Sequence, residues 1–199
     1  MRRGLDAEVE RLHEIFYRDQ LRQLPQVEQT MGDQAVTLLG QVTAACASVS
    51  SLGEATETLF NTHPDAEITV SFPGLSAIAG ARVLAEIGDD RQRFADARGI
   101  KAYAGAAPVT RASGRSHVVL SRTAKNQRLA SAGYMWAFSA LRSAEPRAHY
   151  DRREAGGEAH TAALRNLFNK LLGCLYHCLQ TRTLYDPNRA FPTHQPLAA

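Results

Sequence analysis

A stretch of 36 residues without proline, Gln26 to Asn61, most restricts what this chain can fold into. It lies between Pro25 and the sequence His63-Pro64-Asp65, and a proline interrupts a helix. Its apolar and small residues recur at alternating spacings of four and three over about four heptads, the repeat of a coiled coil. The spacing therefore predicts one long helix over 26–61. The repeat consists of Met31, Ala35, Leu38, Val42, Ala45, Val49, Leu52, Thr56 and Leu59.

The seam formed by this repeat is thin, because Ala35, Ala45 and Thr56 are small or polar. Two arrangements remain open: a helical hairpin within one chain, with a first helix over 3–24, and a dimer zipper. In either case we predict an arm at 1–62 and a compact domain at 63–186. The end of the chain, 187–199, is rich in proline and polar residues and is predicted to be disordered.

The compact domain is predicted to begin with a tight turn between helices, Phe72-Pro73-Gly74-Leu75-Ser76. Such a turn presents backbone N–H groups at a helix N-terminus, where they can hold a phosphate. The turn resembles the helix-hairpin-helix of DNA-binding proteins, and Gly74, Leu75 and Ser76 are the candidate phosphate contacts. Ser76 stands where a second glycine is expected, so we predict that it acts as an N-cap. A plain turn between helices explains the sequence equally well.

Charge is distributed unevenly along the chain. Formal net charge is +3, but residues 97–199 carry fifteen basic and five acidic side chains, whereas 1–96 carry eight and fifteen. No Asp or Glu occurs from Ala97 to Ala144, where eight Arg and Lys lie. Such a segment favours a polyanionic partner. Arg122, Lys125 and Arg128 are the candidate DNA contacts; the alternative is a solvated basic face.

A second candidate site is the segment Ala107 to Ser116, predicted to be a loop, in which Ser113-Gly114 lies between Arg111 and Arg115. Guanidinium groups hold phosphate oxygens, and a nearby alcohol can attack phosphorus. The alternative is an ordinary turn with two solvated arginines. Just after it, residues 117–120 are predicted as a short strand or an extended loop.

Further helices are predicted over 94–104, 126–142, 147–155 and 158–180, which makes the fold mainly α: a coiled-coil arm followed by a compact helical domain with little sheet. Leu129, Gly133, Trp136 and Ala140 form one stripe that is predicted to face the core. Cys174, His177 and Cys178 share part of one helix surface, but they are predicted to be small buried residues, with no metal site. The odd number of cysteines, with no signal peptide and no apolar run near transmembrane length, predicts a cytoplasmic protein. Neither a Walker loop nor a dinucleotide fingerprint occurs, which argues against nucleotide-dependent chemistry.

The order of these parts resembles one transposase family. The parts occur in this order: FPGLSAIAGARVLAEIGD, RFADARGIKAYAGAAPVTRASG, a basic stretch, a Tyr/Trp-bearing helix, and a Leu-rich helix before Tyr185-Asp186-Pro187. This order is similar to the C-terminal half of bacterial insertion-sequence transposases of the one-ten, one-sixteen and nine-zero-two type. These transposases are also called DEDD or bridge-RNA-guided serine recombinases. The resemblance implies DNA transposition or site-specific recombination. It places the family's nucleophilic serine on Ser113, which would form a phosphoserine–DNA intermediate. Arg111 and Arg115, assigned from chemistry, would stabilise charge on phosphorus.

The resemblance also implies an N-terminal RNase-H-like domain with four acidic metal ligands. Asp6, Glu8, Glu10 and Glu14 fall on a predicted helix and do not match it. We therefore expect no cofactor in this chain, and Mg²⁺ only with the acidic domain. The expected partners are DNA, a structured guide RNA and further copies of the chain, with no membrane.

Two functions of different classes follow. The chain is either the serine-bearing half of a transposase, active when an acidic domain is supplied, or a non-catalytic nucleic-acid-binding remnant. We expect it to be incomplete as an enzyme, as a truncated or split gene product or an excised domain would be.

Overall fold

The computed structural model describes residues 4–192, except for the side chains of Ser116 and His117. The chain divides into two units, Met1–Ser51 and Leu52–Ala199. The boundary lies eleven residues, about three helical turns, earlier than the predicted boundary after residue 62. The reason is that the end of the long helix belongs to the compact unit: Phe60 is buried in the core, with its ring against the helix position of Gly80.

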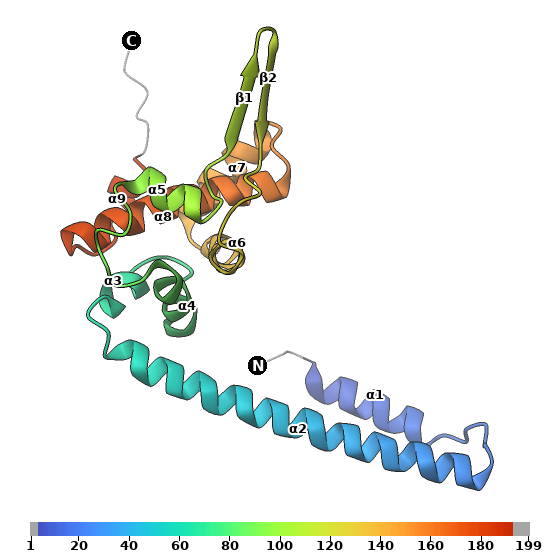
Figure 1. The fold of residues 1–199 in the computed structure, drawn as a ribbon. Coiled ribbons are helices and arrows are strands. Elements are labelled where there is room, and N and C mark those ends of the chain that lie inside the picture. The colour runs from blue at the N-terminus through green and yellow to red at the C-terminus, as the bar shows by residue number, and fades with distance from the viewer. Residues whose placement is uncertain (1–3, 193–199) are drawn as a thin grey trace. The chain divides into compact units, whose positions relative to one another are not determined.

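The N-terminal unit consists of α1, Leu5–Tyr17, and most of α2, Pro25–Asn61 (Figure 1). The predicted first helix is too long, because Arg18 is extended and ends α1 there. Pro25 is the first residue of α2, a position where a missing N–H group costs nothing. The seam residues of α2 are largely exposed, with Leu38 at 60% and Val49 at 70%. Pairing of this seam with another helix therefore stays a prediction.

The expectation that the chain has no apolar run near transmembrane length is wrong for α2. From Gln34 to Gly53 the chain has no charged residue, and Pro25–Asn61 is long and apolar enough to cross a membrane by length and composition. The heptad pattern hid this, because many of the residues between the seam positions are Ala, Gly, Val or Leu. This finding alone is weak evidence, since the core helix of a soluble protein meets the same criterion.

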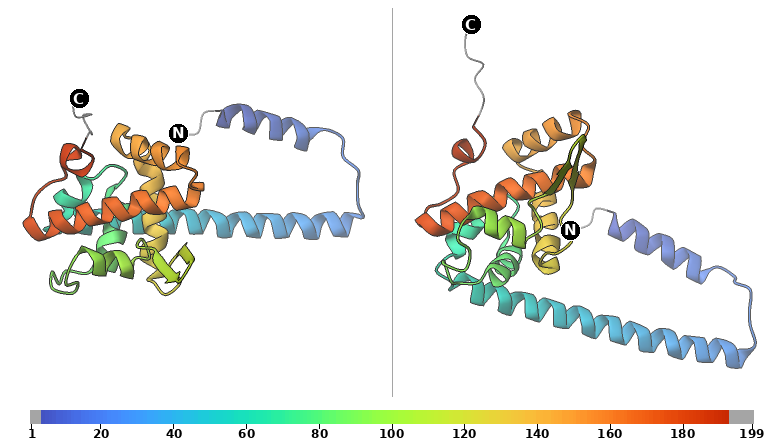
Figure 2. Two further views of the ribbon diagram at one scale, coloured as in Figure 1. Left: turned by 90° about the horizontal axis from the view of Figure 1, so that it is seen from above. Right: turned by 45° about the horizontal axis from the view of Figure 1, so that its top comes forward.

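The compact unit is built around α8, His160–Thr181, whose inward residues are almost fully buried. In the left view of Figure 2, α8 crosses this unit with α5 and the β-hairpin on one side and α7 and α9 on the other. The remaining elements are α3, Ala66–Val70; α4, Ala77–Ile87; α5, Ala97–Tyr103; α6, Gln127–Ala140; α7, Ala144–Ala155; and α9, Pro187–Ala190. The mainly α fold class is confirmed.

Helices α6 and α8 cross at a close contact that a glycine permits. Gly133 lies directly against the ring of Phe168, where a β-carbon would overlap the ring. One turn further along α6, Trp136 is 1% exposed and packs edge-on against both Phe72 and Phe168. Its indole Nε1 donates a hydrogen bond to the Pro73 carbonyl at 3.0 Å. The predicted core-facing stripe of α6 is confirmed.

Two further predictions are wrong in part. Residues 107–116 are not a loop, since β1, Val109–Ser113, pairs antiparallel with β2, Ser116–Leu120. The predicted disorder at 187–199 fails at its start, because Pro187–Ala190 forms α9 and Phe191 is 8% exposed in the core. An apolar residue anchors this segment despite its polar composition, and Asp186 caps it by accepting the Asn188 N–H group. Residues 193–199 lie outside the described residues.

Candidate nucleic-acid site and nucleophile

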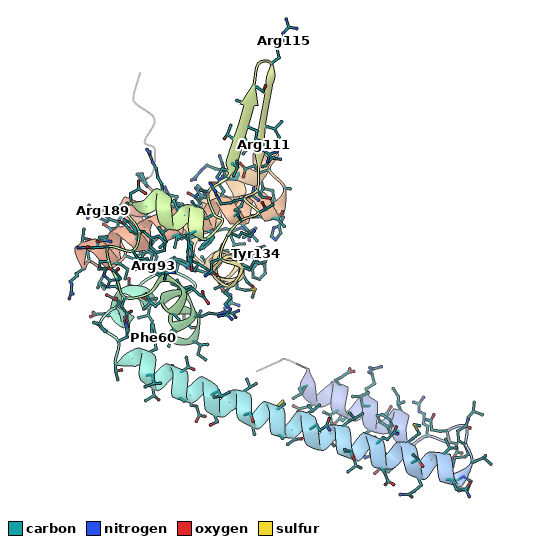
Figure 3. All side chains as sticks on the ribbon, viewed as in Figure 1. Phe60, Arg93, Arg111, Arg115, Tyr134 and Arg189 are labelled. Carbon is teal, nitrogen blue, oxygen red and sulfur yellow. The ribbon has the colours of Figure 1, made fainter. Side chains whose placement is uncertain are left out.

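Ser113 lies at the end of β1, where the hairpin turns. The register pairs Ser113 with Ser116 and leaves Gly114 and Arg115 as a two-residue turn. Gly114 has a φ of 54°. The favoured two-residue turns require a positive φ at this first position, which glycine adopts without strain. Figure 3 shows Arg115 at the tip of the hairpin and Arg111 further down β1.

The hairpin presents Ser113 and Arg111 on one face. These residues are two apart on β1, so their side chains point to the same side of the strand. Val119 pairs with Thr110 on the opposite face and lines a cavity with residues of α7 and α8, among them Arg153 and Ala162. The serine and its nearest arginine on β1 therefore lie on the face turned away from that cavity, and both are exposed.

The Ser113 hydroxyl has no activating partner within the described part of the chain: no hydrogen bond joins it to a histidine or carboxylate there. A serine hydroxyl is a weak nucleophile until a base or a positive charge activates it. The described residues of the hairpin thus provide a reachable alcohol beside guanidinium groups.

The three other basic candidates lie at the base of the hairpin and the start of α6. Arg122 and Lys125 are half-buried, and the Lys125 stem covers Gly105, which has a φ of 69°. Arg128 is exposed. Strand β2 separates this group from the tip by about 13 Å, at 3.3 Å per residue. The structure therefore places Arg111 and Arg115 with Ser113, and Arg122, Lys125 and Arg128 apart from it.

Glu86 of α4 is an acidic residue beside this basic group that the sequence analysis did not single out. Its carboxylate accepts a hydrogen bond from Asn126 Nδ2 at 2.7 Å and lies 3.9 Å from the Arg128 guanidinium. Asn126 also donates to the Tyr103 hydroxyl at 2.6 Å, and its Oδ1 caps α6 by accepting the Leu129 N–H group. Glu86 is 40 residues before Asn126 in the chain. No local pattern signals that contact; the fold alone creates it.

The predicted turn at residues 72–76 joins α3 to α4. Ser76 has a φ of −84°, and its hydroxyl accepts the Ala79 N–H group at 3.4 Å, which confirms the predicted N-cap. Gly74 has a φ of 82°, and a β-carbon there would lie 2.6 Å from the backbone nitrogen of Ala140. The turn therefore packs against the end of α6. Leu75 is buried, whereas Gly74 and Ser76 are exposed.

The turn and the basic group do not form one surface along α6. Gly74 contacts Ala140 at the end of the helix, and Arg128 lies in its first turn. Twelve residues at 1.5 Å each separate the two positions by about 18 Å. Phosphate binding by the turn stays a prediction.

Cys178 is buried and Cys174 is half-buried, and burial raises the pKa of both thiols. His177 is exposed, so the prediction of a buried residue is wrong at this position. Within residues 4–192, no cluster of three or more His, Cys, Asp or Glu has the arrangement of a metal site. The described residues therefore do not fit the Mg²⁺ centre that the acidic domain would supply.

Comparison with known proteins identifies the region that carries this geometry. Residues 66–151, from α3 into α7, match the model of the transposase IS116/IS110/IS902 family. We call this part of the chain the transposase region because of that similarity. It contains Ser113 and all eight candidate binding residues.

Relatives extend the likeness beyond the transposase region. A mini-circle protein of IS117 from Streptomyces coelicolor, described by its name as a transposase, is 53% identical over 190 residues, 95% of this chain and 46% of that protein. A 42 kDa protein of insertion element IS900 from Mycobacterium paratuberculosis is 38% identical over 66% of this chain and 33% of its own length. A 43.6 kDa protein of IS110 from Streptomyces coelicolor is 31% identical over 75% and 37%. The chain spans less than half the length of each of these relatives.

Proposed function

We propose that this chain is the serine-bearing, C-terminal half of an insertion-sequence transposase and acts in DNA transposition. One observation carries the proposal: within the region that matches the model of this transposase family, Ser113 is exposed at a hairpin turn, on the same face as Arg111. An alcohol that must reach a DNA phosphate has to project from the domain, and a hairpin tip does this. The lack of acids from 97 to 144 supports DNA as the partner.

In the proposed reaction the Ser113 oxygen attacks a backbone phosphorus. A new Oγ–P bond forms, the bond from phosphorus to a deoxyribose oxygen breaks, and the proton lost by the serine is balanced by one gained on the released sugar hydroxyl. The number of phosphoester bonds is unchanged, so rejoining by the reverse reaction needs no external energy source. Arg111 and Arg115 stabilise the negative charge that builds up on the phosphate oxygens.

Among the side chains that the structure describes, none forms a hydrogen bond with the Ser113 hydroxyl. We propose that an acidic metal-binding domain, in the same longer protein or in a second chain, completes the site when DNA is bound. Oligomerisation through the α2 seam, a structured guide RNA and a cytoplasmic location belong to the same proposal.

The missing activating partner also favours the second candidate, a non-catalytic nucleic-acid-binding protein. The two separate in one experiment. The chain is incubated with end DNA of its own element, with and without the acidic domain, and covalent protein–DNA adducts are sought on denaturing gels. An adduct that needs Ser113 and persists in Ser116→Ala supports the transposase; DNA binding without any adduct in the complemented reaction supports the second candidate.

A further inference from the structure

A cavity of about 390 Å³ lies between α5, α8 and the segment that leads into α9. It contains none of the residues assigned to the hairpin, the basic group or the turn. Its lining includes Lys101 of α5, Lys170 and His177 of α8, and Arg189 of α9. Figure 3 labels Arg189 on this side of the compact unit. Three cations from three separate elements thus converge on one space.

No carboxylate of the described residues pairs with these cations. Within residues 4–192, neither Lys101, Lys170 nor Arg189 has a carboxylate oxygen within 4.0 Å. Asp186 is the one acid in the lining, and its Oδ1 accepts the Asn188 N–H group at 2.9 Å. Lys101 and Lys170 are also half-buried. Half-buried cations without a carboxylate partner create a positive potential that an anion can neutralise.

Gly173 fixes the position of one of these cations. A β-carbon at this site in α8 would lie 2.6 Å from Cε and 2.7 Å from Nζ of Lys101. The helix surface without a side chain at Gly173 therefore lets the ammonium group lie against α8, close to Cys174. The positive charges of Lys170 and Lys101 both oppose the rise in pKa that burial causes at that thiol. The other lysine is held by the ring of Phe191, with Nζ 5.2 Å from the ring centre.

Tyr185 also lines the cavity and packs against the compact unit. The Tyr185 ring lies 4.6 Å from that of Phe72, and its backbone N–H donates to Ser71 Oγ at 3.0 Å. Its hydroxyl is buried without a hydrogen-bond partner among the described residues, and burial raises its pKa far above the ordinary range. The tyrosine is therefore neutral and adds no negative charge to the cavity.

We propose that this cavity binds a phosphate group. Three cations approaching from different elements suit an anion with three or more acceptor oxygens better than a single carboxylate, and Arg and Lys are the usual phosphate-binding side chains. The volume leaves room for a sugar or base beside the phosphate. The phosphate belongs either to a nucleic acid or to a free nucleotide or phosphate ion. The cavity and the hairpin share no residue, so phosphate binding in the cavity does not depend on Ser113.

The test titrates inorganic pyrophosphate into the full chain by calorimetry, at constant ionic strength. Lys101→Ala and Lys170→Ala should each weaken binding about tenfold, the loss expected for one charge-assisted hydrogen bond. Gly173→Ala should also weaken it, although it removes no charge, because it displaces the Lys101 ammonium. The matched control is Arg98→Ala, which removes one exposed cation of α5 outside the cavity and should leave affinity within about twofold.

Two results would overturn the proposal: no pyrophosphate binding by the wild-type chain, or equal losses in Arg98→Ala and Lys101→Ala, which would indicate nonspecific attraction. Circular dichroism confirms that each variant is folded. A 5′-phosphorylated oligonucleotide that displaces pyrophosphate assigns the cavity to a nucleic-acid phosphate. An oligonucleotide that binds without displacing it assigns the cavity to a free phosphate or nucleotide.

Discussion

Replacing Gly133 by Ala should destabilise the compact unit, although alanine is the better helix former. In an exposed helix interior this change stabilises by about 1 kcal/mol. At position 133 the added carbon would overlap three atoms of the Phe168 ring. That ring cannot move aside freely, because it is 3% exposed and its centre lies 6.0 Å from that of Trp136.

The cost of the overlap sets the expected magnitude. Overpacking a filled core costs about 1–3 kcal/mol, and the upper end applies because a rigid ring faces the new methyl group. Subtracting the helix-propensity gain leaves a net loss of about 2 kcal/mol. For a domain of this size, the loss lowers Tm by about 4–8 °C. Thermal and urea unfolding followed by circular dichroism measure both quantities.

A second substitution tests the cause. In a Phe168→Leu background the ring is absent, so Gly133→Ala should stabilise by about 1 kcal/mol, which gives a coupling energy of about 3 kcal/mol. Gly40→Ala in α2 is the matched control, since a β-carbon there meets nothing within 4 Å. A Gly133→Ala protein as stable as the wild type, or the same loss in both backgrounds, would refute the packing argument.

Three other perturbations test separate parts of the account. Replacing Arg122, Lys125 and Arg128 together by Ala should reduce the slope of log affinity for DNA against log salt by about 2.7, at about 0.9 for each lost phosphate contact. As the control, replacing the exposed Arg11, Arg18 and Arg22 by Ala should leave the slope unchanged. Leu38→Asp should abolish any association through the α2 seam in sedimentation while the compact unit stays folded, because a charge would enter an apolar seam; Gln41→Asp outside the seam is the control. Burial and nearby positive charge lower the pKa of His149 from its ordinary value of 6.5. The unfolded chain therefore binds a proton at this residue more readily than the folded chain does, and the free energy of unfolding should fall as pH drops below about 6.5. His149→Gln should flatten that decline.

The helices were predictable where periodicity and capping agree. The stripe of α6 shows core-facing spacing and an Asn at its N-cap, and Ser76 caps α4 as its position before an apolar run predicts. The hairpin was only half predictable. The residues of β1 are mostly polar or small and show no alternation, so β1 becomes visible only through its pairing with β2.

Contacts between distant segments explain the rest of the differences. Nothing near Glu86 in the sequence announces Asn126, and nothing near Gly173 announces Lys101. Phe191 lies in a segment of polar composition, yet it is buried in the core. The composition of a segment does not show which of its residues pack against the rest of the fold. The family resemblance assigned the candidate nucleophile to Ser113, and Arg111 and Arg115 were assigned from chemistry because they are its neighbours in the sequence. Its exposure at a hairpin tip required the fold.

The most direct test of the central claim is to identify the residue that carries DNA in the complemented reaction. Trypsin cleaves after Arg111, Arg115 and Arg122, so the two neighbouring serines fall in different peptides. After nuclease treatment, mass spectrometry should find a phosphate-linked nucleotide on Ala112-Ser113-Gly114-Arg115. A nucleotide on the peptide from Ser116 to Arg122, or on neither peptide while an adduct forms, would contradict the assignment of Ser113 as the nucleophile.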